Sequence, residues 1–547
     1  MSTRTDQPPA DTAAAPHNPW TDWRRPLAAG AGLLTAAAAL GVAQLVAVLT
    51  GPETAPVTAV GQGVVRIVPE WLKEWAIRTF YIYDKVALIA GTTILLGLFA
   101  GLLGLLAIRW LTAACAGVGL FGVVGALAAM TAPNAAQLDM LPSLLGAVVG
   151  VVALRLLVPR LLAVTETFDV ERAREKVSQV LRMREQERFR EDRRRFIIAA
   201  CATLGVAAVG GGAGQLLGTR TNVTQAIATT RLPKPASAAP PLPAGIDPDI
   251  YGLTRFTTPN VNFYKIDTTL VTPQVNPATW QLRIHGMVDR ELTISFPQLL
   301  ARPLIERDIT LACVSNEVGG GLVGNARWLG APLADLLREA GVRPGADQVF
   351  TRSVDGWTCG TPTEAIMNTP NAMLAVGMNG VPLPAAHGFP VRMIVPGLYG
   401  YVSGTKWIVD LELTTVNAGP QPYWIQREWA APAPIKTMCR IDVPGDGAAL
   451  DAGKPVKVAG VAWAQNRGIS AVEVRVGKDD WQPARLVPVP GNQTWRQWVF
   501  DWTPPARGRF TLFARATDGT GEPQTSQFAD PFPSGATGWP SMTVDVS

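Results

Sequence analysis

One unpaired cysteine stands at the end of an apolar run and just before a glycine-rich loop. The segment is LACVSNEVGGGLVGNARW, residues 311–328, in which Cys313 precedes three consecutive glycines at 319–321. A thiolate is a soft ligand that suits a transition metal. Glycines let a backbone pass close to a bound group. The segment therefore predicts a metal held by Cys313, with the glycines close to the cofactor, although a lone cysteine at a strand end is more often a small buried hydrophobic residue.

A second segment gathers basic side chains among glycines. Residues 387–407, HGFPVRMIVPGLYGYVSGTKW, contain His387, Arg392 and Lys406. Such side chains beside glycines suit an anionic ligand that the backbone approaches closely. Together with the thiol they indicate an anionic organic cofactor. Taken alone, His387 is more often a structural histidine, and Asp355 with the following glycine is most simply a turn.

The elements around these segments indicate a mixed α+β domain followed by an all-β domain. Residues 280–286 alternate like a strand, residues 331–342 form an amphipathic helix, and residues 390–397 are strongly β-prone. After about residue 430 no helical pattern interrupts the strands. The predicted strands lie at 455–464, 471–477, 495–504 and 509–518. This pattern predicts a C-terminal sandwich of immunoglobulin size.

The first part of the chain is far more apolar than the rest. It predicts a membrane region of about five transmembrane helices at 27–50, 86–108, 110–132, 140–159 and 196–217. Residues 219–248 are rich in Pro and Ala and indicate a linker. The predicted domains are the membrane region at 1–218, this linker, a cofactor domain at 249–429 and the β-sandwich at 430–547.

Basic residues predict how the spans are oriented. Arg24 and Arg25 precede the first span, Arg109 separates the second from the third, and residues 161–195 hold ten Lys or Arg. The positive-inside rule then places the C-terminal part outside the cytoplasm. The run at 193–195 with the next two residues also resembles a twin-arginine export signal. The positive-inside rule alone produces the same cluster, so both interpretations stay open.

Composition narrows the possible partners. A net charge of +5 over 547 residues, without a recognisable basic motif, predicts no nucleic-acid partner. No CxxC pair occurs among the five cysteines. The only histidines are His17, His285 and His387, so the membrane region cannot hold a bis-histidine haem and no haem is expected. An electron carrier must then bind otherwise or belong to a separate partner.

Residues 250–547 resemble the sulfite oxidase family of molybdopterin enzymes, which includes assimilatory nitrate reductases and periplasmic sulfoxide reductases. The resemblance rests on LACVSN at 311–316 and on MNGVPLPAAHGFPVRMIVPGLYG at 378–400, followed by TKW at 405–407. The sandwich, reached through IKTMCRIDVP at 435–444, resembles the C-terminal dimerisation domain of that family. The resemblance does not cover residues 1–220.

The resemblance implies a role for individual residues. Cys313 would ligate molybdenum, and Arg327 and Lys265 would supply positive charge to an anionic substrate. Sulfite-oxidising members carry a tyrosine where this chain has Trp429, and an arginine where it has Lys265, which weakens sulfite as the substrate. The implied cofactor-binding residues are Tyr264, Lys265, Ser353, His387, Arg392, Ser403, Gly404, Thr405 and Lys406.

These observations predict a membrane-anchored molybdopterin-dependent oxidoreductase. It would transfer an oxygen atom to or from a small sulfur oxyanion or a sulfoxide, exchange electrons with a separate protein, contact membrane lipid and form a homodimer. The alternative is a non-catalytic membrane receptor or scaffold whose sandwich binds a partner. Intact Cys313, His387, Arg392 and Lys406 argue against loss of the cofactor. Transport is disfavoured, because the only charge within a span is Arg155, near one end.

Overall fold

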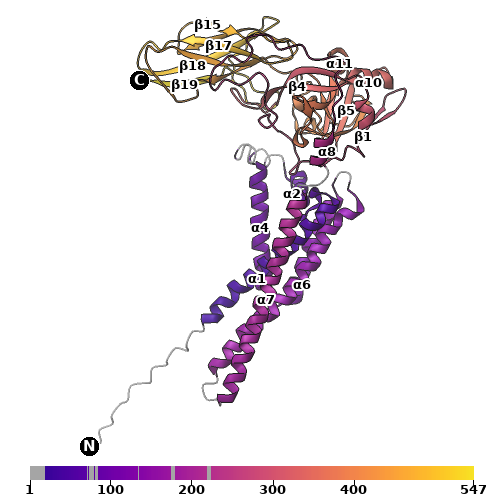
Figure 1. Cartoon of the computed structure of the whole chain (residues 1–547), viewed down its shortest axis with the longest axis vertical. Coiled ribbons are helices and arrows are strands. Elements are labelled where there is room, and N and C mark those ends of the chain that lie inside the picture. The colour runs from indigo at the N-terminus through magenta and orange to yellow at the C-terminus, as the bar shows by residue number, and fades with distance from the viewer. Residues whose placement is uncertain are drawn as a thin grey trace, which may run out of the picture. The chain divides into compact units, whose positions relative to one another are not determined.

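The computed structural model describes residues 19–69, 84–132, 135–173, 179–218 and 223–547, together with residues 72, 75 and 79. His17 lies outside the described residues. The chain divides into two compact units, Met1–Thr219 and Arg220–Ser547. The first unit is helical and the second is rich in sheets (Figure 1).

Long apolar helices make up the first unit. They are α1 (Pro19–Thr50), α4 (Asp84–Ala107), α5 (Leu111–Met130), α6 (Leu141–Ala173) and α7 (Gln179–Gly218). Each contains a stretch long and apolar enough to cross a membrane, and each of the five predicted spans overlaps one of them and extends at most two residues beyond its ends. The sequence pattern does not predict the shorter helix α2 (Pro56–Ile67).

Small residues bring these helices close together. Helix α1 packs against α4, α6 and α7 (Figure 1). A Cβ atom added at Gly32 would lie 2.1 Å from the Ala100 carbonyl oxygen, and one at Gly146 would lie 2.7 Å from the Ala39 carbonyl oxygen. Because no side chain separates the backbones at these points, the helices pack at their closest distance, as is common between apolar helices in membranes.

The mixed α+β part of the second unit contains two sheets. One has the order β2 (Leu292–Ser295), β1 (Gln281–Gly286), β10 (Ile408–Thr414), β5 (Gln348–Ser353) and β6 (Thr358–Pro362). The other has the order β3 (Ile305–Ala312), β4 (Val323–Pro332), β7 (Met373–Met378) and β8 (Val381–Pro382), with β9 (Arg392–Ile394) also paired to β7. The helices are α9 (Phe296–Leu300), α10 (Leu333–Ala340) and α11 (Thr363–Asn368).

Local sequence explains these elements. Leu282 and Ile284, on one face of β1, are fully buried, as the alternation at 280–286 predicts. Helix α10 buries its apolar face and ends at Gly341, whose φ of 72° gives a left-handed cap. Both sheets contribute to one apolar core around these residues. This core holds the loops that carry the candidate site.

Two further sheets form the C-terminal part. They are β11 (Met438–Val443), β13 (Val456–Trp463), β17 (Arg496–Trp502) and β16 (Arg485–Leu486), and opposite them β12 (Ala448–Leu450), β19 (Ser541–Val546), β18 (Gly508–Asp518), β14 (Ile469–Val476) and β15 (Gln482–Pro483). Side chains of both sheets share one apolar core. Figure 1 shows these strands in yellow and orange.

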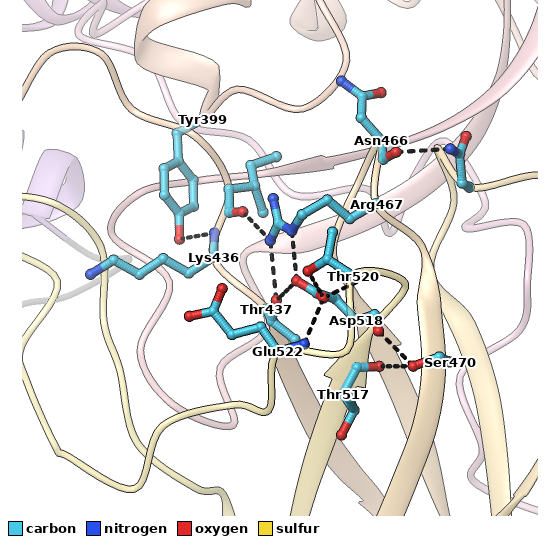
Figure 2. Close-up of polar contacts among 12 residues, drawn as sticks. Tyr399, Lys436, Thr437, Asn466, Arg467, Ser470, Thr517, Asp518, Thr520 and Glu522 are labelled. Carbon is cyan, nitrogen blue, oxygen red and sulfur yellow. Dashed lines mark hydrogen bonds and ion pairs between the residues drawn. The ribbon is translucent and has the colours of Figure 1, made fainter.

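The two parts of the second unit are joined by a common core and a buried aspartate. Trp495 donates from Nε1 to the Phe256 carbonyl oxygen at 2.9 Å. Asp518, at the end of β18, accepts hydrogen bonds from Thr437, Arg467 and Thr520 (Figure 2). Burial alone would raise the pKa of Asp518, but these hydrogen bonds outweigh it and hold the pKa well below its ordinary value of 3.8. The carboxylate therefore stays ionised at the junction.

The structure differs from the predicted tether over residues 223–248. Helix α8 (Val223–Thr229) packs Val223 into the core around β3 and β4. The backbone N–H of Ala236 donates to the Leu304 carbonyl oxygen at 2.8 Å, and Ser237 pairs with Ile305. The Pro/Ala-rich composition hides these contacts because they are made by the backbone rather than by a periodic apolar face.

Candidate cofactor-binding site

An open cavity of about 940 Å³ lies in the mixed α+β part of the second unit. This volume includes the open space at the mouth of the cavity. Four separate segments form its walls: residues 263–268, the loop after β3, the end of β5 and residues 387–429. Of the predicted site residues, seven line the cavity: Tyr264, Cys313, Ser353, His387, Arg392, Gly404 and Lys406.

The cysteine loop presents one thiol to this cavity. Cys313 directly follows β3, and its backbone N–H donates to the Leu322 carbonyl oxygen at 2.9 Å. The Asn316 side chain closes the same loop by accepting from the Leu322 N–H at 2.6 Å. Burial raises the pKa of the Cys313 thiol. The loop therefore holds the sulfur at the cavity wall through a backbone hydrogen bond and the Asn316 side chain.

The role predicted for the three glycines of this loop is wrong. The residues that line the cavity include Cys313, Val314 and Ser315 but none of the glycines at 319–321. Gly319 has a φ of 75°, which favours glycine. A Cβ atom at Gly320 would lie 2.8 Å from Asn316 Oδ1. Gly319 and Gly320 thus make the turn from β3 to β4 possible, and none of the three glycines lines the cavity.

Arg392 is a buried cation without an acidic partner among the described residues. Its side chain lies over the Trp328 ring at 5.1 Å from the centroid, and Nη1 donates to the His387 carbonyl oxygen at 3.3 Å. Its Nε has no hydrogen-bond partner within the described part of the chain. Burial lowers its pKa to about 10, although Tyr264 opposes the shift. A buried unpaired charge is costly, so this site fits an anionic ligand that completes it.

His387 is held as a neutral ring at the cavity wall. Its Nε2 lies 2.9 Å from the Asn260 carbonyl oxygen, which can only accept, so Nε2 carries the hydrogen. Burial lowers the pKa of His387 to about 4, and the charges of Arg392 and Lys406 add to the shift. Phe263 packs edge-on against the ring at 5.6 Å. The remaining nitrogen, Nδ1, is therefore a hydrogen-bond acceptor.

The implied cofactor-binding residues at 403–406 divide into residues that face the cavity and residues that do not. Gly404 and Lys406 line the cavity, and Lys406 Nζ donates to Asp267 at 2.7 Å. The Ser403 hydroxyl donates to the carbonyl oxygens of residues 398 and 399. The Thr405 hydroxyl bonds the Thr351 hydroxyl at 2.6 Å. The last two side chains are thus engaged within the protein, which leaves their backbone groups to contact a ligand.

The two basic residues predicted to meet a substrate do not line the cavity. Arg327, on β4, forms an ion pair with Asp308 on β3 at 2.8 Å. This pair follows from the strand register, which places the two residues opposite each other. Lys265 is exposed, and its charge contributes to the lowered pKa of His387. Neither position supports the predicted contact with an anionic substrate.

The sequence motifs assign no binding role to the aromatic and acidic residues that follow residue 264 in the cavity lining. The lining includes Trp357, Trp407, Trp424 and Trp429, and the last two pack edge to face at 6.0 Å. Asp267 and Asp355 also line it, and burial raises the pKa of Asp355. The only local signal was the aromatic run at 423–429, from which we noted Trp429 alone. The predicted turn at Asp355 is present, with Gly356 at a φ of 83°.

The protein side chains do not form a metal cage by themselves. Within the described ranges, no group of three or more His, Cys, Asp or Glu could hold an ion. A metal at Cys313 would need its other ligands from an organic molecule or from solvent. One thiol, one unpaired buried guanidinium and a neutral histidine fit a metal carried by an anionic organic cofactor.

Several known proteins are similar in sequence to this part of the chain. Residues 269–424 match the model for the oxidoreductase molybdopterin binding domain. Sulfite oxidase of Gallus gallus is 30% identical over 299 residues, 46% of this chain and 64% of that protein. Mitochondrial sulfite oxidase of Mus musculus is 29% identical over 314 residues, 48% of this chain and 56% of that protein. Oxidoreductase YuiH of Bacillus subtilis, described as uncharacterized, is 33% identical over 138 residues, 25% of this chain and 67% of that protein. The chain thus spans less than two thirds of the two sulfite oxidases.

Proposed function

Because this chain belongs to the sulfite oxidase family of molybdopterin-dependent oxidoreductases, we propose that it is a membrane-anchored enzyme that transfers an oxygen atom to or from a small sulfur compound. The observation that carries the proposal is the environment of Arg392, a buried guanidinium whose Nε points to no partner among the described residues. A scaffold that had lost its cofactor would gain nothing from keeping such a charge.

The cavity residues would share the work of holding the cofactor. Cys313 would ligate molybdenum, and Arg392 would pair with an anionic or carbonyl group of the pterin. His387 would accept a hydrogen bond at Nδ1, and Gly404 and Lys406 would contact the terminal phosphate. The bound cofactor supplies the two-electron oxygen-atom transfer. The protein would position the cofactor, exclude water and place neutral hydrogen-bonding groups around the Cys313 sulfur.

The cavity lining favours a sulfoxide over a sulfur oxyanion as the substrate. Arg392 is needed for the cofactor, Lys406 is paired with Asp267, and Arg327 is paired outside the cavity. Once the cofactor is bound, little positive charge remains for a dianion such as sulfite. Trp424 and Trp429 offer apolar and aromatic surface to an uncharged organic group instead. A separate electron carrier completes the reaction.

Metal analysis tests the cofactor and turnover tests the substrate. The full chain, purified in detergent from a molybdenum-replete host, is expected to carry about one molybdenum per chain, as one cavity would hold one cofactor. A Cys313→Ser variant should lose most activity with an artificial electron donor or acceptor. An aryl methyl sulfoxide should give the higher kcat/KM, and sulfite the lower. A molybdenum-free protein would exclude the enzyme and leave the scaffold.

The remaining features of the proposal concern the rest of the chain. The five apolar helices support an anchor in a membrane. The second unit would lie outside the cytoplasm, as the basic residues between the spans predict, and would be exported with or without the arginine run at 193–195. The two sheets at 430–547 support an immunoglobulin-like domain, and the resemblance of this domain to a dimerisation domain suggests that it would pair two copies of the chain. Accessibility of an introduced cysteine at the exposed position Ser547 to a membrane-impermeant thiol reagent tests the sidedness, because only an external, exposed thiol reacts.

A further inference from the structure

A second cavity lies inside the helical unit, among α1, α4, α5 and α6. It encloses about 620 Å³, including the space at its opening, and small or apolar side chains form nearly all of its lining. The exceptions are two hydroxyl groups, those of Thr35 on α1 and Ser143 on α6. Charged side chains are absent from this lining. A ligand here must therefore be apolar and uncharged, with a small number of polar atoms.

Both hydroxyls are buried and lack a partner. Thr35 and Ser143 are each 3% exposed, and neither oxygen has a hydrogen-bond partner within the described part of the chain. A hydroxyl inside a helix usually donates to the carbonyl oxygen four residues earlier. In the same unit Thr93 does so to Ile89, and Thr203 to Ala199, each at 2.7 Å. Thr35 thus lacks the hydrogen bond that these two threonines make, and both hydroxyls remain available to a ligand in the cavity.

The helices cannot close this space by moving together. Beside the cavity, a Cβ atom at Gly32 would lie 2.1 Å from the Ala100 carbonyl oxygen. One at Gly122 would lie 2.3 Å from the Ala147 Cβ. The backbones are therefore already at contact distance on two sides, where α1 meets α4 and where α5 meets α6. A cavity that persists between such contacts is part of the packing and not a loose region.

The two hydroxyls come from different helices and lie at different heights along α6. Thr35 lies against Gly150, because a Cβ atom there would be 3.7 Å from Thr35 Cγ2. Ser143 precedes Gly150 by seven residues on α6, a rise of about 10 Å. The two hydroxyls therefore lie at different heights along the bundle, where each can donate to a different acceptor of one ligand. A six-membered ring with carbonyl groups at opposite positions offers one acceptor to each hydroxyl.

Aromatic side chains line the same space. Phe99 on α4 and Phe121 on α5 pack with ring centroids 6.0 Å apart and planes tilted by 32°. Both are lining residues. Flat rings pack well against aromatic side chains. The combination of aromatic wall, apolar surface and two donors selects a flat dione over a simple acyl chain.

We propose that this cavity binds a lipophilic quinone, whose two carbonyl oxygens accept hydrogen bonds from Thr35 and Ser143 while its ring lies against Phe99 and Phe121. The apolar substituent of the quinone would extend along the small residues of α1 and α6. Binding at this site does not depend on the molybdenum chemistry proposed for the second unit. It requires only that the five apolar helices fold as a bundle.

Direct binding tests this proposal. The full chain in detergent is titrated with decylubiquinone, and quenching of tryptophan fluorescence gives the Kd. The double variant Thr35→Val and Ser143→Ala removes both donors and keeps most of the side-chain volume, so the Kd should rise at least tenfold. The matched control is Thr203→Val, which removes a hydroxyl that already has a helical partner and should leave the Kd unchanged. Organic extraction of the purified protein should yield host quinone by mass spectrometry.

Several results would overturn the proposal. An equal Kd for the wild-type chain and the double variant would show that the hydroxyls do not contact the ligand. Absence of saturable binding, or recovery of a phospholipid without quinone, would assign the cavity to lipid. A melting curve of each variant confirms that the bundle is folded. Molybdenum is measured in the same samples, so failure of the cofactor proposal is seen separately from failure of quinone binding.

Discussion

At the scale of single residues, three basic side chains differ in the group that neutralises their charge. Lys406 pairs with Asp267, and Arg327 pairs with Asp308, whose side chain is 3% exposed. Arg392 is buried without a carboxylate among the described residues. A cation that has an internal partner serves the fold first, whereas one without a partner needs a ligand. This difference distinguishes Arg392, which would bind the cofactor, from Arg327, which is neutralised within the protein.

Substitutions of Arg392 and of Arg327 should therefore have opposite effects on molybdenum content and on stability. In Arg392→Gln, molybdenum content should fall at least tenfold, while the molybdenum-free protein should unfold at the same or a higher temperature, because a costly buried charge is gone. In Arg327→Gln, molybdenum content per folded chain should stay unchanged. The free energy of unfolding should fall by about 3 kcal/mol, because Asp308 is left buried and unpaired.

Metal analysis and thermal unfolding of both variants check this expectation. The Arg392→Lys variant is a matched control, since it keeps the charge but not the planar arrangement of donors. Normal molybdenum content in Arg392→Gln would contradict the role given to this residue.

At the scale of elements, the site residues lie at the ends of strands and in the loops that adjoin them. The strands hold these loops in position. Cys313 follows β3, Arg392 begins β9, and Ser353 ends β5. The segment 435–437 links this part to the two-sheet part, and Asp518 at the end of β18 fixes it through Arg467 and Thr437 (Figure 2). An ionised carboxylate thus contributes to the stability of the junction, beside the shared apolar core.

Acid should weaken this junction in a defined range. The pKa of Asp518 is lower in the folded chain than the 3.8 of an unperturbed aspartate, so the unfolded chain takes up the proton first as pH falls. Its contribution to stability is present above about pH 4 and is lost progressively below it. Asp518→Asn should abolish this part of the pH dependence and lower stability at pH 7 by about 3 kcal/mol. Chemical denaturation of the second unit from pH 3 to pH 7, roughly the range where carboxylates titrate, gives both quantities, and parallel curves for the two proteins would refute the role of Asp518.

At the scale of the whole molecule, the second unit behaves as one folded body although it has two parts. One buried cluster contains Phe256 and Tyr399 from the α+β part and Trp463 and Trp495 from the two-sheet part. Residues 223–248 also pack on the α+β part. The helical unit has its own buried residues and its own cavity. The chain therefore divides near residue 220 and not near residue 430.

Truncation should reveal this division. A protein of residues 223–547 should be soluble, bind molybdenum and unfold in one transition, because it keeps the shared cluster intact. A protein of residues 223–434 should fail to fold cooperatively, because Tyr399 and Phe256 lose the apolar surface of Trp463 and Trp495. Calorimetry of both proteins checks the expectation. Two separate transitions for residues 223–547 would show that the parts are independent.

The sequence by itself determined the features that depend on local pattern. Uncharged apolar runs predicted five long helices, alternation predicted strands such as β1, β14 and β18, and the motifs around Cys313 and His387 predicted the family. Only the tertiary structure decided which side chains reach the cavity. Arg327 is paired because β3 lies beside β4, the tryptophans meet the cavity because residues 357 and 424–429 converge on it, and residues 223–248 pack by backbone contacts. Such contacts join residues far apart in the chain, so local patterns carry no signal of them.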